Sequence, residues 1–420
     1  MLEVALITWV LNQDKRALFL ISTSYPYGHL EPLLHYEVKR FCERYEQIVI
    51  FCSSTEDELK YELPHKVHVI PFSNELSLWE KIKGSASFFS KACRAERKQI
   101  KAMSGVNPSL AHHKILLNSF ALMQKFQKIA SPIEKKFREF QIDYYSYWCD
   151  EPIMSSAILS SKNVVSRMHG YDLYTERHKP AYLPFRKAFH DSARKILFIS
   201  NQGKNYFKSK YKVNEDKLQT LYLGVTNCFQ TPPRNKDSRI NLISCSSIIP
   251  LKRIQLIADL VKVIGASTVV NWIHIGDGSE REKIIAHCRR ELEGNNNISY
   301  AFLGEMSPAM VMKHYQENFY DFFVNLSETE GLPISIMEAN SFQIPAVATN
   351  VGGVSEIVSE NSGILVDLNP NINHLALKLR ELFTDQTEYQ RMRKTAYEKW
   401  LHYFNGEKNT DKLIEALSNQ

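Results

Sequence analysis

The sequence predicts an α/β fold made of two doubly wound domains, and three observations lead to this expectation. The chain has 420 residues, which is long for a single hydrophobic core. From about Arg239 onward, short runs rich in β-branched residues alternate with helical stretches, and the first half shows the same alternation more loosely. Runs that are apolar throughout are typical of parallel strands covered on both faces. Each half is therefore expected to form a Rossmann-like domain.

The first half, residues 1–230, supplies six expected strands and a long helical insertion from Glu75 to Phe140. Its first strand lies in the run RALFLISTSYPYG (Arg16–Gly28), which ends in turn residues. Met1–Lys15 carries its basic residues behind its apolar run, the reverse of a signal peptide, and is interpreted as an extension. The expected strands are Leu18–Thr23, Gln47–Cys52, Lys66–Ile70, Tyr144–Trp148, Val164–Met168 and Lys195–Ser200.

The second half, residues 239–398, begins after TPPRNKDSR (Thr231–Arg239), whose proline and charge content is typical of a linker. Arg391–Phe404 and Asn409–Leu417 are predicted to form two final helices. The expected strands are Ile240–Ile248, Val269–Gly276, Ile298–Gly304, Asp321–Ser327, Pro345–Asn350 and Gly363–Asp367. The expected helices between them are Arg253–Val263, Arg281–Leu292, Pro308–Glu317, Pro333–Phe342 and Asn373–Phe383.

The bulk composition is that of an ordinary globular protein, with 44% hydrophobic and 23% charged residues. Seven cysteines are scattered without a CxxC pair, which indicates neither a disulfide framework nor a zinc site. No apolar run reaches the roughly 20 residues that a membrane helix needs. A reducing cytoplasm is the expected location.

The positive charge of the chain is unevenly distributed. Between Phe88 and Phe140, 11 Lys and Arg residues face only three acids, and apolar residues such as Phe120, Met123 and Phe126 recur at helical spacing. One interpretation is a solvated helical face. The other is a surface that contacts anionic lipid head groups at the inner face of a membrane, or a phosphorylated acceptor. Nucleic acid is not expected, because no recognition motif accompanies the charge.

Two glutamates stand in the mostly apolar stretch ETEGLPISIMEANSF. Glu330 follows an expected strand, and Pro333 suits the first position of the next helix, along which Glu338 lies. Gly331 lets the backbone approach a ligand, and the free N–H groups of the helix start suit a diphosphate. The two carboxylates could accept hydrogen bonds from a hexose and a ribose. The alternative is a capping acid followed by a solvated one.

The spacing Glu330-x7-Glu338, followed by IPAVATNVGGVSEIV (Ile344–Val358), resembles the nucleotide-sugar signature of the family-4 retaining glycosyltransferases of GT-B fold. The resemblance covers nearly the whole chain from about Arg16 and is closest to bacterial enzymes of capsule, exopolysaccharide or lipopolysaccharide assembly. It implies two Rossmann-like domains that face each other across a cleft. Further matching segments are Ser24–Phe41, Arg167–Tyr174, Leu221–Val225, Ser244–Arg253, His274–Ile284 and Phe302–Ser307.

This resemblance implies roles for individual residues. Glu338 would bind the ribose hydroxyls. Glu330 would hold the donor sugar, together with the backbone N–H groups after Gly331. Leu332 and Pro333, which follow Gly331, would border the donor there.

The diphosphate would meet Lys252, which would neutralise it and stabilise the leaving group. Arg253 would assist, unless it is simply an exposed helical arginine. Many relatives carry an arginine shortly before this lysine, where this chain has Ser246 and Ser247. Part of the usual positive clamp is therefore missing or comes from elsewhere.

In the first half, the resemblance implies that His169 approaches the donor sugar, with Asp172 close behind it. A lone histidine is also a common structural residue, but this one is expected at the carboxyl end of a strand. Gly28, at the end of the first strand, would allow a close loop. Gly276 and Gly278 could border a nucleotide, or form a plain β-turn.

The sequence therefore predicts a retaining, metal-independent glycosyltransferase that moves a sugar from a nucleoside-diphosphate sugar, with UDP or GDP, to a glycan or lipid-linked acceptor. No tightly bound cofactor is expected. By resemblance, residues 399–420 would pack back on the first domain. The alternatives are a GT-B nucleotide-sugar epimerase, an inverting transferase, or a non-catalytic scaffold of a polysaccharide assembly complex at the membrane.

Overall fold

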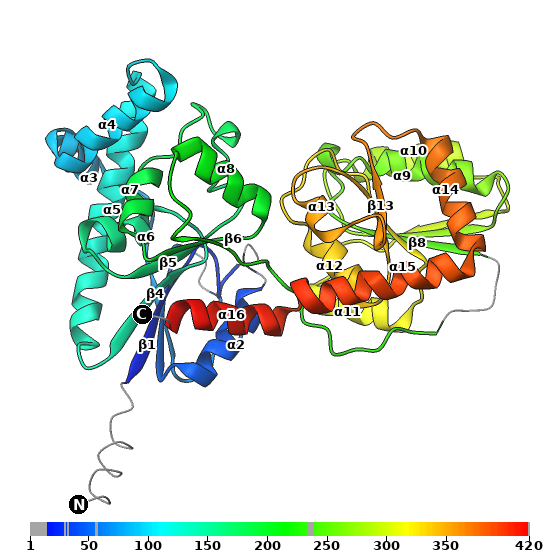
Figure 1. Cartoon of the computed structure of the whole chain (residues 1–420), viewed down its shortest axis with the longest axis horizontal. Helices are drawn as coiled ribbons and strands as arrows, with labels where there is room; N and C mark the ends of the chain where they lie inside the picture. The colour runs from blue at the N-terminus through cyan, green and yellow to red at the C-terminus, as the bar shows by residue number, and fades with distance from the viewer. Residues whose placement is uncertain (1–14, 29–30, 32, 55–57, 234–238, 419–420) are drawn as a thin grey trace, which may run out of the picture. The chain divides into compact units, whose positions relative to one another are not determined.

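The computed structural model describes residues 15–28, 31, 33–54, 58–233 and 239–418. The chain divides into two compact units, which are described one at a time (Figure 1). Unit 1 is Met1–Leu221 with Thr410–Gln420, and unit 2 is Tyr222–Asn409. Each unit contains one parallel sheet with helices on both faces, so the predicted α/β fold of two Rossmann-like domains is confirmed. Residues 1–14 of the expected extension and 234–238 of the expected linker lie outside the described residues.

Unit 1 holds a parallel sheet in the order β3-β2-β1-β4-β5-β6-β7. The central strand β1 is buried along most of its length, as its apolar sequence predicts. All six expected strands are present, although β4 begins three residues earlier, at Gln141. The strand that was not predicted, β7, has only three residues. The strands are β1 (Arg16–Ser22), β2 (Gln47–Cys52), β3 (Val67–Pro71), β4 (Gln141–Ser146), β5 (Val164–Met168), β6 (Lys195–Phe198) and β7 (Leu218–Thr220).

Helices cover both faces of this sheet and bury two hydrophobic clusters, one on each side (Figure 1). The last helix, α16 (Gly406–Ser418), belongs to one of these clusters, because Leu413 and Leu417 are fully buried beside α2 and β2 residues. The other helices are α2 (Leu34–Arg44), α3 (Leu78–Ala86), η1 (Ser87–Phe89), α4 (Lys91–Ser104), α5 (Leu110–Lys136), α6 (Glu151–Met154), η2 (Ser155–Leu159), η3 (Thr175–Arg177), α7 (Arg186–Ser192) and α8 (Asn201–Tyr211).

The helical insertion consists of α3, η1, α4 and the 27-residue α5. The apolar residues Phe120, Met123 and Phe126 of α5 are buried in the core of unit 1. Their helical spacing therefore marks the side of α5 that packs into the core. On another side, α3 approaches α5 so closely that a Cβ on Gly84 would lie 2.7 Å from the Ala121 Cβ.

Unit 2 holds a parallel sheet in the order β10-β9-β8-β11-β12-β13, and every strand expected in this half is present. Its core lies on both sides of β8 and β11 and includes the fully buried Trp272. The strands are β8 (Ile240–Cys245), β9 (Val270–Ile275), β10 (Ile298–Phe302), β11 (Phe322–Asn325), β12 (Ala346–Thr349) and β13 (Gly363–Val366). The helices are η4 (Pro250–Lys252), α9 (Ile254–Gly265), α10 (Arg281–Leu292), α11 (Pro308–Glu317), α12 (Ile334–Ser341), α13 (Val354–Ile357), α14 (Ile372–Thr384), α15 (Gln386–Lys399) and η5 (Trp400–Phe404).

Several helix starts differ from expectation, and at two of them the conformation of the preceding residue gives the reason. Arg253 adopts a left-handed conformation with φ +48°, which separates η4 from α9, so the helix begins at Ile254. Pro333 is extended and precedes α12 instead of being its first helical residue. In both cases the backbone turns just before the helix, at the edge of the sheet where loops gather. No helix of the described ranges combines the length and apolarity required to traverse a lipid bilayer.

Candidate functional site

The strand order of unit 2 changes direction between β8 and β11, which are neighbours in the sheet although far apart in the chain. In open α/β sheets the loops at the carboxyl ends of such a pair diverge and leave room for a ligand. Here one loop leads to η4 and Lys252, and the other contains Glu330. A hydrogen bond of 2.8 Å from the Glu328 N–H to the Leu251 carbonyl ties the two loops together.

Lys252 and Glu330 form an ion pair at this point, with 2.7 Å between Nζ and Oε1. The same oxygen accepts a hydrogen bond of 3.1 Å from Asn325 Nδ2, at the end of β11. The Glu330 side chain is only 9% exposed, so its charge depends on these partners. The arrangement places a cation and a hydrogen-bond acceptor side by side, as binding of a phosphorylated sugar would require.

Arg253 is also at this site, but its guanidinium binds backbone carbonyls. Its Nε donates to Leu326 O at 2.6 Å, and one terminal nitrogen donates to Leu368 O at 2.7 Å. The other terminal nitrogen lies 3.4 Å from Ser327 O. In this arrangement Arg253 holds the loop between β11 and Glu330 in place, so it acts on the ion pair through the backbone.

The start of α12 lies directly after this loop. No side chain caps it, since Pro333 precedes it with an extended backbone, and Leu332 and Pro333 are buried. A Cβ on Gly331 would meet nothing within 4 Å, which leaves open space above the loop. The N-terminus of the helix is thus a region of free N–H groups beside Lys252 and Glu330, suited to an anion.

Two glycines, Gly352 and Gly353, allow their backbone to lie close to the backbone of the Glu330 loop. Gly352, with φ +55°, faces the Glu330 carbonyl, and a Cβ there would be 1.9 Å from that oxygen. The Gly353 N–H donates to Gly331 O at 2.7 Å. The GG pair of the sequence motif therefore supports the Glu330 loop through direct backbone contact.

Glu338 lies on α12, partly buried. Burial raises the pKa of its carboxyl from 4.5 to about 7. Its charge in turn raises the pKa of the Cys245 thiol, after the larger effect of burial. Glu338 therefore lies near the end of β8, where a pocket of about 270 Å³ opens at the carboxyl ends of β8, β9 and β10. The pocket is lined by Cys245, Ser246, Ser247, Ile275, Gly276, Asp277, Glu305 and Met306.

Gly276 and Gly278 shape this pocket by contact with the loop after β8. A Cβ on Gly276, whose φ is +134°, would lie 1.9 Å from Ser246 O. A Cβ on Gly278 would lie 2.5 Å from Ile248 O. Both glycines are thus accounted for by close backbone packing, and they position Ser246 and Asp277 at the wall of the pocket.

In unit 1, His169 follows β5 and is only 7% exposed. Its ring lies against Tyr147 and Trp148, with centroids 4.6 and 4.3 Å away, and neither ring nitrogen has a hydrogen-bond partner among the residues that the structure describes. Burial, helped by the charge of Arg167, lowers its pKa well below 6.5. The imidazole is therefore neutral near pH 7.

Carboxylates fix the loops around this histidine. Asp172 accepts hydrogen bonds from the His169 N–H at 2.6 Å and from the Cys149 N–H at 2.7 Å. Burial raises the pKa of Asp172 to about 6. Glu31 accepts from the N–H groups of the loop after β1 and from the indole of Trp148 at 2.8 Å.

Gly28 closes the loop after β1, because its N–H donates to Ser24 O at 2.7 Å and a Cβ there would be 2.7 Å from the Ser24 Cβ. The loop thus needs a glycine for its own packing. It lies in the same unit as His169, while the Lys252–Glu330 ion pair lies in the other. Among the residues that the structure describes, no group of three or more His, Cys, Asp or Glu is placed to hold a metal ion.

Neither Asn325 nor Glu31 was singled out from the sequence. Asn325 is the last residue of an apolar strand, and that position could have indicated it. Glu31 lies in the matching segment Ser24–Phe41, but its five acceptor contacts join residues up to 117 apart in the chain and could not be inferred from local sequence.

Residues 229–399 match the protein family described as "Glycosyl transferases group 1". The chain is 28% identical over 180 residues to the O-antigen biosynthesis glycosyltransferase WbnH of Escherichia coli, covering 42% of this chain and 47% of that protein. It is 21% identical over 328 residues to the N-acetyl-alpha-D-glucosaminyl L-malate synthase of Bacillus anthracis, covering 73% and 83%. The chain thus spans about half the length of the first of these relatives.

Solved structures resemble the chain over nearly its whole length. Anabaena Alr3699/HepE in complex with UDP and glucose superposes with a TM-score of 0.62 at 17% identity, covering 97% of this chain and 100% of that one. The lipopolysaccharide outer core galactosyltransferase WaaB superposes with a TM-score of 0.65 at 15% identity, covering 96% and 99%. At such identities the likeness establishes the fold, the two-domain architecture called GT-B, and nothing finer.

Proposed function

We propose that this protein is a glycosyltransferase that moves a sugar from a nucleoside-diphosphate sugar to a hydroxyl of a glycan acceptor in surface-polysaccharide synthesis. The observation that carries the proposal is the Lys252–Glu330 ion pair beside the uncapped start of α12, at the switch point of unit 2. This site lies inside the segment that matches the group 1 glycosyltransferases.

The donor would occupy the site from the pocket toward the ion pair. Its ribose hydroxyls would donate to Glu338, and its base would lie in the pocket between Ser246 and Asp277. The diphosphate would lie at the start of α12, where Lys252 stabilises the charge that develops as the nucleotide leaves. Glu330, freed from Lys252, would accept hydrogen bonds from the sugar.

The chain contains Ser246 and Ser247 where the resemblance to family-4 glycosyltransferases would place an arginine, and the Arg253 guanidinium binds backbone carbonyls. Lys252 and the N–H groups of α12 would therefore provide most of the charge complementarity of unit 2. A cation and a helix N-terminus can perform the task that a divalent metal performs in other transferases, and we propose a metal-independent reaction on that basis.

The finer assignments follow the same relatives. WbnH is described as an O-antigen biosynthesis glycosyltransferase, and WaaB as a lipopolysaccharide outer core galactosyltransferase. By analogy, we propose a lipid-linked glycan as acceptor at the cytoplasmic face of a membrane. HepE is described in complex with UDP and glucose, which favours UDP over GDP. We propose that the stereochemistry at the transferred sugar is retained, and that His169 in unit 1 contacts the donor sugar as a neutral donor or acceptor.

Donor binding tests the proposal directly. UDP- and GDP-sugars are screened by thermal shift. A ligand at 100 times its dissociation constant adds about 2.7 kcal/mol to the free energy of unfolding. We expect stabilisation by one UDP-sugar, and release of UDP once an acceptor is supplied. Glu330→Gln should lower turnover at least about 100-fold and leave donor binding measurable, because the amide keeps the shape of the side chain.

Contrary outcomes point to the rival functions. Binding of a nucleotide sugar with interconversion of its sugar, and no transfer, would indicate an epimerase. An inverted product would indicate the other stereochemical class of transferase. No stabilisation by any nucleotide or nucleotide sugar would overturn the enzyme proposal and leave a scaffold.

A further inference from the structure

The outer side of the helical insertion exposes large apolar side chains. Leu78 and Trp79, in the first turn of α3, are 72% and 73% exposed, and Ile82 one turn later is exposed as well. The opposite side of α3 contacts α5 through Gly84. Thus α3 packs on its own unit with its smallest residue and leaves its largest ones uncovered.

Further large apolar side chains of the helical insertion are exposed beyond α3. Phe89, at the end of η1, is exposed, and so are Met103 and Val106 at the end of α4. Leu110, the first residue of α5, is 89% exposed. Single exposed apolar residues are ordinary, but a cluster of this kind within one segment marks an interaction site. We call Leu78–Leu110 the insertion tip.

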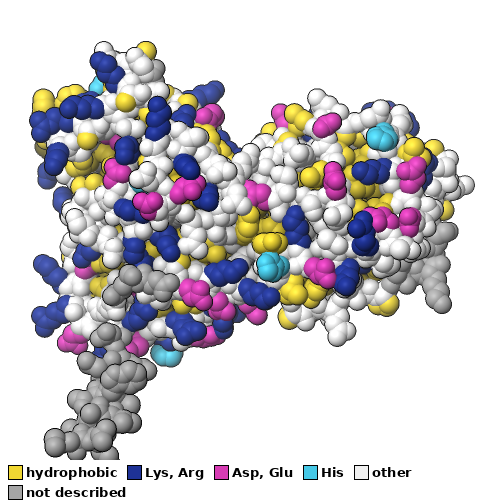
Figure 2. All heavy atoms as spheres, viewed as in Figure 1, with side chains coloured by type: hydrophobic (Ala, Val, Ile, Leu, Met, Phe, Trp, Pro, Cys, Tyr) yellow, Lys and Arg dark blue, Asp and Glu magenta, His cyan; other side chains and the backbone are white. Residues whose placement is uncertain are grey.

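The insertion tip is also strongly basic (Figure 2). Of its two acids, Glu96 is buried and accepts hydrogen bonds from Tyr182 and from the Phe185 N–H. Glu80 caps α3 and lies 3.7 Å from Lys125. Neither acid neutralises the outer face. The cations there are exposed and form no ion pair with any described residue; they are Lys81, Lys83, Lys91, Arg94, Lys98 and Lys101.

The composition of the insertion tip points to lipid. Protein interfaces are depleted in lysine, whereas five of the six free cations here are lysines. Lysine stems with apolar and tryptophan neighbours are typical of segments that lie in the head-group region of an anionic bilayer. The apolar side chains enter the boundary with the acyl chains, and the ammonium groups remain at the phosphates.

We propose that the insertion tip docks on an anionic phospholipid surface. The docking itself does not depend on the proposed function. Only its biological use rests on that function, since a lipid-linked acceptor would be presented at such a surface. The proposal also shifts the expectation from sequence, which placed the contact across residues 88–140, because the insertion tip begins at Leu78 and ends at Leu110. The helical face beyond Leu110 has no part in it.

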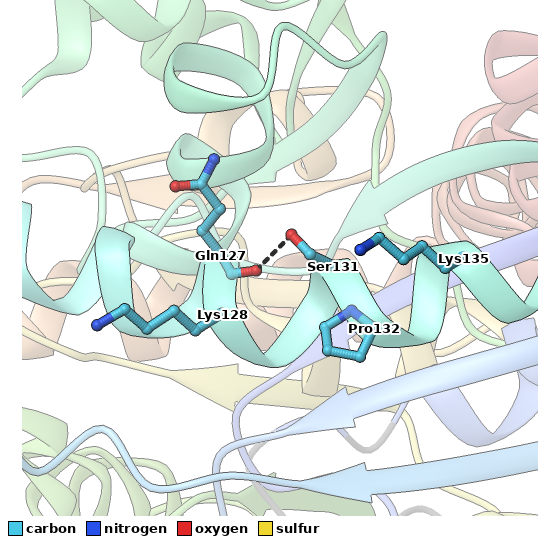
Figure 3. A pocket seen from close by; sticks show the side chains of 5 residues that line it. All are labelled: Gln127, Lys128, Ser131, Pro132 and Lys135. Atoms are coloured by element: carbon cyan, nitrogen blue, oxygen red, sulfur yellow. Dashed lines mark hydrogen bonds between the residues drawn. The ribbon is translucent and has the colours of Figure 1, made fainter.

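The basic part of α5 is excluded from the docking surface because it lacks large exposed apolar side chains. Lys128 and Lys135 border a shallow hollow of about 480 Å³ at Pro132, where Ser131 Oγ donates to Gln127 O at 2.7 Å (Figure 3). Within α5, large exposed apolar side chains are absent after Leu110. Charge without apolar groups to insert is typical of a solvated helical face.

Co-sedimentation of the full-length protein with vesicles tests the docking. Vesicles of phosphatidylcholine are compared with vesicles that also contain phosphatidylglycerol. We expect binding to the anionic vesicles only, weakened by added salt. Trp79→Ser should lower the partition coefficient about tenfold, because an inserted apolar side chain is lost. Lys81→Glu with Lys83→Glu should lower it at least about tenfold.

Matched controls lie on α14 of unit 2, where Leu377 and Lys378 are adjacent and exposed. Leu377→Ser and Lys378→Glu should leave vesicle binding unchanged, and circular dichroism confirms that every variant is folded. Three results would overturn the docking: no binding to anionic vesicles at low salt, equal losses in tip and control variants, or a concentration-dependent dimer that Trp79→Ser abolishes.

The two proposals fail separately. Thermal stabilisation by UDP-sugars is measured on the same variants without vesicles. Vesicle binding without nucleotide binding would end the enzyme proposal and keep the docking surface. Nucleotide binding without vesicle binding would end the docking proposal and keep the enzyme proposal.

Discussion

At the scale of single residues, the central feature is the ion pair between Lys252 and Glu330. The Glu330 carboxylate is held by Lys252 and Asn325 in a nearly buried position. An unpaired charge in such a position is costly, whereas the pair itself contributes little net stability. Removal of one partner should therefore affect stability as well as the proposed function, and a test of one role must separate it from the other.

Lys252→Ala should lower the free energy of unfolding by about 2–3 kcal/mol, because Glu330 would lose its charged partner while remaining nearly buried. Denaturation by urea measures the change. The control is Lys262→Ala, whose ion pair with Glu291 is 2.8 Å long but more exposed, and which should cost below about 1 kcal/mol. Equal costs in the two variants would contradict the role given to burial.

Glu338 should make stability depend on pH. Burial raises its pKa from 4.5 to about 7, so between these values the folded state holds a proton that the unfolded state has released. The free energy of unfolding therefore falls as pH rises from about 4.5 to about 7. Glu338→Gln has no carboxyl to titrate, so its free energy of unfolding should not show this fall. The difference in free energy of unfolding between the variant and the parent should therefore shift in favour of the variant by up to about 3 kcal/mol between about pH 5 and pH 8.

Urea denaturation at several pH values checks this expectation. Glu305→Gln, at an exposed position of the same pocket, is the control. If the parent and Glu338→Gln curves run parallel over the whole range, the carboxyl is not desolvated as described.

At the scale of elements, the close contact of α3 with α5 depends on one glycine, Gly84. An alanine at Gly84 gains helix propensity but places its Cβ 2.7 Å from that of Ala121. Gly84→Ala should therefore be destabilising by about 1–2 kcal/mol. Combining it with Ala121→Gly should recover part of the loss, and the coupling energy of the double-mutant cycle measures the contact. Additive effects would show that α3 shifts freely.

Helices and strands that follow from a local sequence pattern were predicted well, whereas those set by distant contacts were not. Strands β2 and β5 were predicted to the residue. β2 is almost wholly apolar, whereas β5 also contains Ser166 and Arg167, which are buried with the rest of the strand. β7 was missed because three residues carry no periodicity. The start of α9 was misplaced because the left-handed Arg253 follows from its bonds to distant carbonyls.

The site divides in the same way. Lys252 and Glu330 lie in the segments that follow β8 and β11, so their proximity could be expected from topology. Asn325 could not be chosen from sequence, since only the fold shows that its side chain reaches Glu330. Sequence pattern cannot tell a glycine that borders a ligand from one that contacts backbone, and Gly276 and Gly278 turn out to touch the loop after β8.

At the scale of the whole molecule, unit 1 is completed by residues from the far end of the chain. Leu413 and Leu417 are fully buried in its core, and Arg194 donates to the carbonyls of Ala416 and Leu417 at 3.0 and 2.9 Å. Unit 1 thus depends on α16 although the chain between them forms unit 2. Its stability cannot be assigned to residues 15–221 alone.

Leu417→Ala should therefore destabilise unit 1 by about 2–5 kcal/mol, the range for a buried leucine. Hydrogen exchange measures this locally. Protection should fall in β1 and β2 and remain unchanged in β8 and β9, which belong to unit 2. Leu377→Ala, at an exposed position of α14, is the control. A uniform loss of protection in both units would mean that they unfold as one.

The position of α16 also has a consequence for synthesis. A ribosome makes the chain from its first residue, so the sheet of unit 1 emerges long before Leu413 and Leu417 do. Unit 2 is contiguous and can fold as soon as it has been made, whereas the α16 side of unit 1 stays uncovered until α16 has been made as well. Unit 1 thus begins to emerge before unit 2 and is completed after it, and in the meantime its apolar face is open to chaperones.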